Sequence, residues 1–343
     1  MIGSIAGVLI LSFTIGALAQ LNMLPKGSGS FFSANPDPVP TPTPTPLPLS
    51  KEYIYAGGSR MLAVEDAGAT QPSATDLAVW RPSNGYWYVM NGITSNVVTQ
   101  QWGYTNDLPS PADFDGDGQT DFSVYRSSNN YWYVVNSSDS SNTYYQIGQS
   151  GDKPVPADYD GDGKADMALL REASSSTWYV VQSSDSQTVQ YTFGTTGDVA
   201  VPADYDGDGK ADIAIFRNGT TPAFWIKQST TGSTITVSYG QTDDKPVVGD
   251  YDGDGRFDIA TFRPSDTIWR ILNSSTNTQT STQLGASSDW LVQGDYDADG
   301  RTDLAVWRES TGYWYILKST TNTLRYEQFG TTGDIPVPAP YRR

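Results

Sequence analysis

Short apolar stretches alternate with polar turn residues over most of the chain after residue 75. One unit reads as four strands, A to D, at residues 199–205 (VAVPADY), 212–217 (DIAIFR), 223–229 (AFWIKQS) and 234–240 (TITVSYG). Such short stretches, separated by Gly, Asn, Asp and Ser, are typical of β-strands joined by tight turns. Together with 33 Gly, 21 Tyr and 10 Trp, the pattern predicts an all-β fold.

The four-strand unit repeats along the chain. An aspartate-rich stretch recurs every 45 or 46 residues, beginning at Asp113, Asp158, Asp204, Asp250 and Asp295. A second marker, an aromatic pair after a turn, occurs six times, at Trp87, Trp132, Trp178, Trp225, Trp269 and Trp314. A repeat of this length with four short strands is typical of a propeller blade.

The two ends of the repeat region complement each other. Strands B, C and D occur six times, starting within residues 75–103, and strand A with its acidic loop occurs five times. The tail at residues 331–343 (TTGDIPVPAPYRR) matches strand A and then stops. We therefore predict a six-bladed β-propeller with four-stranded blades, in which the C-terminal strand closes the first blade. Seven blades remain the alternative if residues 52–66 form blade strands of their own.

The acidic stretch between strands A and B has the spacing of a cation-binding loop. Aspartates stand at positions 1, 3, 5 and 9, and a glycine at position 6 permits a sharp turn, as in the first half of an EF-hand loop. A divalent cation offsets the repulsion between the carboxylates, and Ca²⁺ fits best because all the ligands are oxygens. Five bound ions would change the net charge from −17 to −7. The predicted ligands are Asp113, Asp115, Asp117, Asp121, Asp158, Asp160, Asp162, Asp166, Asp204, Asp206, Asp208, Asp212, Asp250, Asp252, Asp254, Asp258, Asp295, Asp297, Asp299 and Asp303.

The closing blade lacks this pattern. Pro340 stands at position 1, and Asp76 alone remains at the equivalent of position 9. We expect about five structural Ca²⁺ ions and none in the closing blade.

The chain before the repeats divides into two segments. Residues 1–24 are apolar and uncharged, with Lys26 the first ionisable side chain and a possible signal-peptidase site at Ala17–Ala19. They fit a signal peptide, a membrane anchor or an assembly helix packed in a filament. Residues 25–51 are a Pro/Thr-rich linker of extended polyproline II character, followed by the predicted propeller at 52–343. All three interpretations place the propeller outside the cell, either secreted or attached to the cell surface.

Composition excludes several functions. The chain has no Cys and no His, which removes disulfides, thiolate catalysis and the commonest zinc ligands. Lys plus Arg number 21 against 38 Asp plus Glu, so nucleic acid is not an expected partner. Catalysis would need a carboxylate pair, a Lys or a Tyr, and no carboxylate pair stands apart from the repeat. We therefore expect no enzymatic activity.

The motif D-x-D-G-D-G-x-x-D-x-A-x-x-R resembles that of the FG-GAP/VCBS repeat proteins, and the resemblance covers roughly residues 70–343. β-Propellers of this family include the integrin α-subunit head and some fungal lectins. The resemblance implies structural Ca²⁺ on the hairpins between strands A and B and a ligand surface on the opposite face. Polysaccharide lyases occur on related propellers, which keeps an enzyme among the alternatives.

Three further regularities accompany the loops. An arginine ends every strand B, at Arg81, Arg126, Arg171, Arg217, Arg263 and Arg308. An aspartate opens every strand A, at Asp107, Asp152, Asp198, Asp244, Asp289 and Asp334. We predict that these form structural ion pairs, with anion or sugar contacts as the alternative. The six tryptophans and their flanking tyrosines are predicted to be core residues.

Sequence variation concentrates in the loops between strands B and C, such as residues 82–86 (PSNGY) and 309–313 (ESTGY). Their Asn, Ser, Gly and Tyr suit weak recognition of sugars or protein surfaces, with Tyr86 and Tyr313 as candidate contacts. The leading hypothesis is an extracellular, Ca²⁺-stabilised, lectin-like module for adhesion or glycan recognition, whose partner is a glycan or a cell-surface protein. The alternatives are a structural subunit of a cell-surface filament, assembled through residues 1–24, and a polysaccharide-processing enzyme.

Overall fold

The computed structural model describes residues 50–56, 60–66 and 74–341. The predicted N-terminal segment 1–24 and the linker as far as residue 49 lie outside the described residues. All the regular elements in the described ranges are β-strands. No helix of the length and apolar character that a membrane crossing requires occurs in those ranges.

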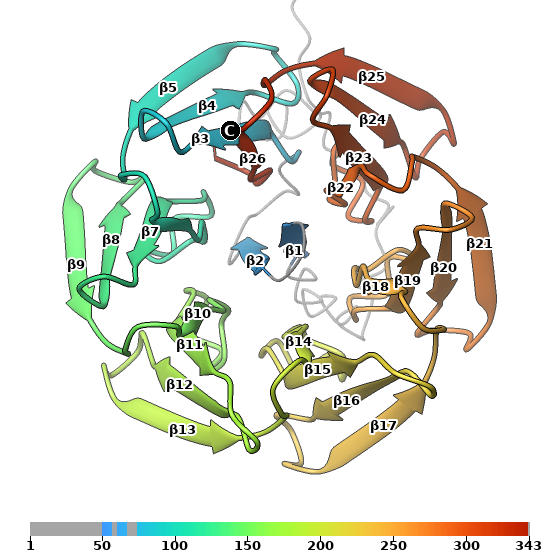
Figure 1. Ribbon diagram of the computed structural model, residues 1–343, viewed down its shortest axis with the longest axis horizontal. Coiled ribbons are helices and arrows are strands. Elements are labelled where there is room, and N and C mark those ends of the chain that lie inside the picture. The colour runs from blue at the N-terminus through green and yellow to red at the C-terminus, as the bar shows by residue number, and fades with distance from the viewer. Residues whose placement is uncertain (1–49, 57–59, 67–73, 342–343) are drawn as a thin grey trace, which may run out of the picture. The chain divides into compact units, whose positions relative to one another are not determined.

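Six blades, each of four antiparallel strands, are arranged as a ring (Figure 1). Blade 1 has the strand order β26-β3-β4-β5, and blades 2 to 6 follow in chain order from β6 to β25. The innermost strands, A, are β6 (Leu108–Pro109), β10 (Lys153–Pro154), β14 (Val199–Ala200), β18 (Lys245–Pro246), β22 (Trp290–Leu291) and β26 (Ile335–Pro336). Strands B are β3 (Leu77–Arg81), β7 (Phe122–Arg126), β11 (Met167–Arg171), β15 (Ile213–Arg217), β19 (Ile259–Arg263) and β23 (Leu304–Arg308).

The outer half of each blade is equally regular. Strands C are β4 (Tyr86–Met90), β8 (Tyr131–Val135), β12 (Thr177–Val181), β16 (Ala223–Lys227), β20 (Ile268–Leu272) and β24 (Tyr313–Leu317). Strands D are β5 (Val97–Gln101), β9 (Asn142–Gln146), β13 (Thr188–Thr192), β17 (Thr234–Ser238), β21 (Gln279–Gln283) and β25 (Leu324–Gln328). The prediction of an all-β propeller with four-stranded blades is confirmed.

Strand A is shorter than the sequence suggested. In blade 4 only Val199 and Ala200 pair continuously with β15, and pairing resumes as an isolated bridge between Ala203 and Asp212. Pro202 stands between the two paired parts, and proline has no N–H to donate to the ladder. Asp212, the aspartate at position 9 of the acidic loop, therefore lies directly before strand B, and the bridge fixes its backbone.

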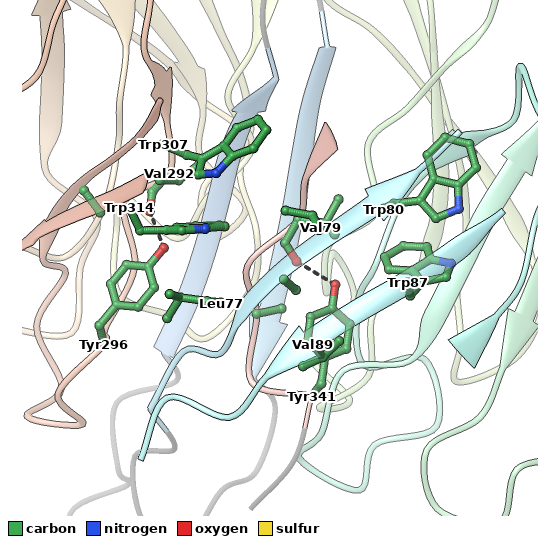
Figure 2. Close-up of a cluster of buried hydrophobic side chains, with 14 of the residues drawn as sticks. Leu77, Val79, Trp80, Trp87, Val89, Val292, Tyr296, Trp307, Trp314 and Tyr341 are labelled. Atoms are coloured by element: carbon green, nitrogen blue, oxygen red, sulfur yellow. Dashed lines mark hydrogen bonds between the residues drawn. The ribbon is translucent and has the colours of Figure 1, made fainter. Parts of the chain in front are cut away.

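The C-terminal strand closes the ring as predicted. β26 pairs with β3 through Ile335↔Trp80 and Pro336↔Val79, which completes blade 1 from the two ends of the repeat region. The hydrophobic core is also continuous from blade 1 to blade 6. Figure 2 shows tryptophans of blades 1 and 6 in one buried cluster with Tyr296, whose hydroxyl donates to the carbonyl oxygen of Val292.

The alternative of seven blades is wrong. β1 (Ser50–Ala56) and β2 (Arg60–Asp66) form a hairpin of their own, with Ser50 opposite Asp66 and Ala56 opposite Arg60. This hairpin joins the inner edge of blade 6 through one pair, Tyr55↔Leu291 (Figure 1). Because β1 and β2 add to an existing sheet, they do not make a separate blade.

Strand C supplies most of the buried tryptophans, with one correction to the sequence interpretation. The side chains of Trp87, Trp132, Trp178, Trp269 and Trp314 are fully buried. In blade 4 the buried position belongs to Phe224, and Trp225 is only half-buried. Phe224 lies opposite Phe216, as Trp178 lies opposite Leu170. Since side chains alternate between the faces of a strand, a shift of one residue moves Trp225 out of the core. The tyrosines that flank these tryptophans are likewise half-buried rather than core.

Candidate metal centres

The A–B loops of blades 2 to 6 bring their aspartates together. We call these five segments the metal loops; they span residues 113–121, 158–166, 204–212, 250–258 and 295–303. In each loop three carboxylates have oxygen atoms within 4.8 Å of one another. In blades 2, 3 and 4 these aspartates stand at positions 1, 3 and 9, and in blades 5 and 6 at positions 1, 3 and 5. The structure thus gathers 15 of the 20 predicted ligands into five compact groups.

The remaining five predicted ligands lie beside these groups and stabilise the loop by accepting hydrogen bonds. In blades 2 to 4, Asp117, Asp162 and Asp208 accept hydrogen bonds from serine hydroxyls at 2.8 to 2.9 Å. In blades 5 and 6, Asp258 accepts three main-chain N–H groups and Asp303 accepts two.

The loop backbone is folded so that it serves the first aspartate. In blade 4 the N–H groups of Gly207 and Gly209 donate to the two carboxylate oxygens of Asp204 at 2.6 and 2.8 Å. These glycines have φ of 83° and 85°, a region that side chains with a Cβ rarely occupy. Asp212, at position 9, accepts the N–H groups of Tyr205 and Ser229. The chain therefore fixes the first and last ligands through its own backbone.

The carboxylates at the two ends of the loops in blades 2, 3, 4 and 6 are buried, and in blade 5 Asp258 is buried while Asp250 is half-buried. Burial raises the pKa of Asp113 to about 8, partly opposed by the N–H donors of the loop. Burial, with the neighbouring charge of Asp115, raises the pKa of Asp121 to about 7. The same causes raise the pKa of Asp166 to about 8 and that of Asp212 to about 7. A nearby cation is the partner that would keep these groups ionised.

Each metal loop also receives hydroxyl groups from the C–D turn of its own blade, a contribution that the sequence interpretation missed. In blade 3, Ser183 Oγ donates to Asp162 at 2.8 Å and Ser184 Oγ donates to Asp160 at 2.6 Å. The donors at the second of these positions are Ser138, Ser184, Thr230, Ser275 and Thr320. Blade 1, which has no acidic loop, has Gly92 and Ile93 at these positions. In the sequence, two hydroxyl residues stand at these C–D turn positions only in the blades that also have an acidic loop. This correlation was the signal from which the contact could have been predicted.

The donor set fits a hard divalent cation. All the converging groups are oxygens, and the Oδ1 atoms of Asp206 and Asp297 are buried with no hydrogen-bond partner in the described part of the chain. Both belong to position 3 of a metal loop. Buried carboxylate oxygens without a donor are expected where a metal ion supplies the missing interaction.

Neighbouring metal loops are joined by backbone hydrogen bonds. The N–H of position 8 in each loop donates to the carbonyl oxygen of position 1 in the preceding loop, as Ala211 does to Asp158 at 2.7 Å and Phe257 to Asp204 at 2.8 Å. The same contact links Thr75 to Asp295 and Thr120 to Pro340, so the chain of contacts passes through blade 1. Position 8 directly precedes the position 9 aspartate. The ligands of one site are therefore adjacent to the backbone of the next.

The predicted Arg–Asp pairs form in all six blades, at the ends of the strands opposite the metal loops. The shortest N–O distance in each pair is 2.6 to 2.8 Å, and each arginine makes a two-pronged contact with the aspartate that opens strand A. The aspartate also accepts the N–H of the residue three before it, as Asp198 does from Thr195. These pairs tie strand B to the turn before strand A, which supports the structural interpretation.

The two tyrosines suggested as sugar contacts are placed differently from expectation. Tyr86 and Tyr313 are the first residues of β4 and β24, not loop residues, and both are half-buried. Their rings lie 6.1 and 6.2 Å from the rings of Tyr88 and Tyr315. Each is therefore partly committed to packing within its blade.

Comparison with known proteins identifies the repeat. Residues 113–169, 158–215 and 204–261 each match the FG-GAP-like repeat family. Each match begins at position 1 of a metal loop and continues through the next loop. No curated protein matches the chain.

Among solved structures, the chain is similar to virginiamycin B lyase from Staphylococcus aureus, with 9% identity, a TM-score of 0.47 and coverage of 83% of this chain and 90% of that chain. It is also similar to a protein of unknown function from Bacteroides caccae, with 14% identity, a TM-score of 0.45 and coverage of 78% and 94%. A chain of a nidogen/laminin complex has 10% identity, a TM-score of 0.49 and coverage of 75% and 94%.

Proposed function

Because the chain is a six-bladed β-propeller built from FG-GAP-like repeats, we propose that it is an extracellular, Ca²⁺-stabilised and non-catalytic module that binds polymeric glycan on a cell surface. The observation that carries this proposal is the chemical difference between the two faces of the ring. One face gathers aspartates into five groups that could each hold a cation, and the other presents loops of different sequence on a repeated ion-paired frame.

Ca²⁺ is the cation that the loops suit best. The aspartates at positions 1, 3, 5 and 9 of each metal loop would hold it, with the glycine at position 6 making the turn. Carboxylate ligands without His or Cys favour a hard cation, and Ca²⁺ accepts more ligands and less regular geometry than Mg²⁺. Extracellular Ca²⁺ would keep such sites filled, which agrees with a location outside the cell.

The role of the cation follows from where the loops lie. Each loop contacts its own C–D turn through hydroxyl groups and the preceding loop through the position 8 N–H. Neutralising the buried carboxylates therefore stabilises the contacts within a blade and between blades. A site filled to a hundredfold above its dissociation constant adds about 2.7 kcal/mol to the free energy of unfolding.

The binding surface is proposed on the face with the B–C loops. These loops differ between blades, for example residues 127–130 (SSNN) and 218–222 (NGTTP), and they are rich in side chains that both donate and accept hydrogen bonds. The arginines beneath them are paired with buried aspartates, so the frame carries little free charge. A polymer suits such a surface because many weak contacts, made by several copies of the protein, add up to firm attachment.

The test uses the full chain and immobilised polysaccharides. We expect the Ca²⁺-loaded protein to bind at least one polysaccharide, with little affinity for the corresponding monosaccharide, and to lose binding when Ca²⁺ is removed. Absence of binding to all polysaccharides, by a protein with the expected melting temperature, would contradict the proposal and favour a structural role in a surface assembly.

A further inference from the structure

The seam between blades 4 and 5 contains a groove on the side of the B–C loops. It is bordered by the B–C loop of blade 4 at Thr221 and Pro222, and by Tyr239 and Gln241 just after β17. The facing wall belongs to blade 5, from β19 to β21, and includes Arg270. The groove has a volume of about 420 Å³, within the roughly 300–1,000 Å³ that small-ligand sites occupy.

The groove coincides with a departure from the repeat. In blades 1, 2, 3 and 6 the middle residue of strand C is a tyrosine, whose ring lies beneath the strand B arginine at 4.2 to 4.8 Å. Blade 4 has Trp225 in the same place, 5.3 Å from Arg217. Blade 5 has Arg270 at this position. The aromatic ring next to the strand B arginine is therefore replaced by a charged side chain that lines the groove.

The charges of this wall balance one another. Arg270 pairs with Asp266 of the B–C loop at 2.5 Å, and Arg263 pairs with Asp244 at 2.7 Å. Asp266 also lies 3.8 Å from Arg263, so two guanidinium groups and two carboxylates form one network. No net positive charge is left to select an anion. The network instead offers donors and acceptors side by side, which suits the hydroxyl groups of a neutral sugar.

The opposite wall combines apolar surface with unused hydrogen-bonding capacity. Pro222, which is buried, gives this wall apolar character, and the half-buried ring of Tyr239 supplies aromatic surface of the kind that packs against a sugar ring. The Tyr239 hydroxyl is buried and has no hydrogen-bond partner in the part of the chain that the structure describes. Burial raises the pKa of Tyr239 to about 12, so the group stays protonated. Gln241 of this wall and Gln279 of the facing blade 5 wall add amide groups to the lining of the groove.

We propose that this groove is a subsite for one pyranose unit of a neutral glycan, an assignment that rests on the glycan-binding function proposed above. The balanced Arg–Asp network would bind hydroxyl groups in the plane of the sugar, and the ring of Tyr239 would contact its C–H face. The groove opens to solvent, so a polymer could continue beyond the bound unit.

The experiment measures binding of the full Ca²⁺-loaded chain to immobilised mannan, dextran, galactan and polygalacturonate. Arg270→Tyr restores the residue that four other blades carry, so it should fold normally. We expect this variant to bind the neutral polysaccharide at least tenfold more weakly at an unchanged melting temperature. Gln279→Ala should weaken binding several-fold, whereas Asn142→Ala, the matched change at the first residue of strand D in blade 2, should have no effect.

The outcomes separate this inference from the proposed function. If the wild-type protein binds and both groove variants bind equally well, the groove is not the subsite, although the glycan-binding function stands. Equal weakening by Asn142→Ala, or binding of polygalacturonate alone, would also overturn the assignment. If the wild-type protein binds none of the four polymers, the assignment fails together with the proposed function.

Discussion

A single Cβ atom shows how closely neighbouring metal loops pack. A side chain at position 4 of the blade 4 loop, Gly207, would place its Cβ 2.9 Å from Cγ of Arg256 in the next loop. Blades 2, 3 and 5 repeat this arrangement with a Lys or Arg stem. Blade 6 has Ala298 at position 4, with φ of 60°, and the following blade has Ala74 in place of the basic residue. The alanine is tolerated because no long side chain crosses it.

The first prediction concerns this alanine. Ala298→Gly should raise the free energy of unfolding by about 0.5–1 kcal/mol, because relief of a left-handed backbone at an alanine outweighs the greater freedom of glycine in the unfolded chain. Gly207→Ala should destabilise the protein, since it adds both the strained φ and the clash with Arg256. Chemical denaturation with Ca²⁺ present measures both. A stabilising Gly207→Ala would contradict the packing described.

The second prediction follows from the buried carboxylates. In Ca²⁺-free protein the pKa of Asp166 is raised to about 8 and that of Asp212 to about 7, from an ordinary value of 3.8. The folded state then binds more protons than the unfolded state between about pH 4 and 8, so stability should fall as pH rises through this window. A bound cation requires the ionised form, so its stabilising effect should grow over the same window.

Melting curves of Ca²⁺-stripped protein, with and without added Ca²⁺, test this at pH 5 and pH 8. The increase in melting temperature on adding Ca²⁺ should be clearly larger at pH 8. An increase that is equal at both values would show that the carboxylates are already ionised without metal.

At the scale of one element, strand β16 shows what a sequence marker can and cannot place. The aromatic pair of blade 4 was recognisable, but its buried member is Phe224, which lies opposite Phe216, and not Trp225. Arg217 lies over the Trp225 ring, as the equivalent arginines lie over tyrosines elsewhere. Residue type alone favours tryptophan as the core residue, whereas the register with β15 decides which neighbour points inward.

The third prediction compares these two aromatic residues. Phe224→Ala should cost about 3–5 kcal/mol because it leaves a cavity in the blade, and Trp178→Ala in blade 3 should behave alike. Trp225→Ala should cost clearly less, since that side chain is half-buried on the other side of the strand. Urea unfolding at saturating Ca²⁺ gives the three values. A larger loss for Trp225→Ala than for Phe224→Ala would restore the interpretation from sequence.

At the scale of the whole molecule, the sequence predicted the ring and its closure but not the contacts between blades. The number of blades followed from counting strands, because a tail with strand A alone complements an N-terminal unit that lacks it. The clustering of aspartates in each metal loop could be predicted from their spacing within one repeat. The links between loops and the groove beside Arg270 depend on how one repeat faces the next. That relation is set by packing across the seam, which the pattern within a repeat does not contain.

These links lead to the last prediction, that the five cation sites do not fill independently. Ala211 donates its N–H to Asp158 of the preceding loop and directly precedes Asp212, a ligand of its own loop. Ordering one loop around a cation therefore fixes the backbone on which its neighbour depends. Asp206→Ala should remove the blade 4 site and also weaken the adjoining sites in blades 3 and 5, more than the distant site in blade 6. Calorimetric titration of Ca²⁺ into stripped protein should show five sites for the wild type, and for the variant a loss of more than one site of wild-type affinity. Asp185→Ala, which removes the same charge from an exposed position in the C–D turn of blade 3, is the matched control and should leave all five sites unchanged. If Asp206→Ala removes one site and leaves the other four affinities intact, the loops act separately and the hydrogen bonds between them carry no coupling.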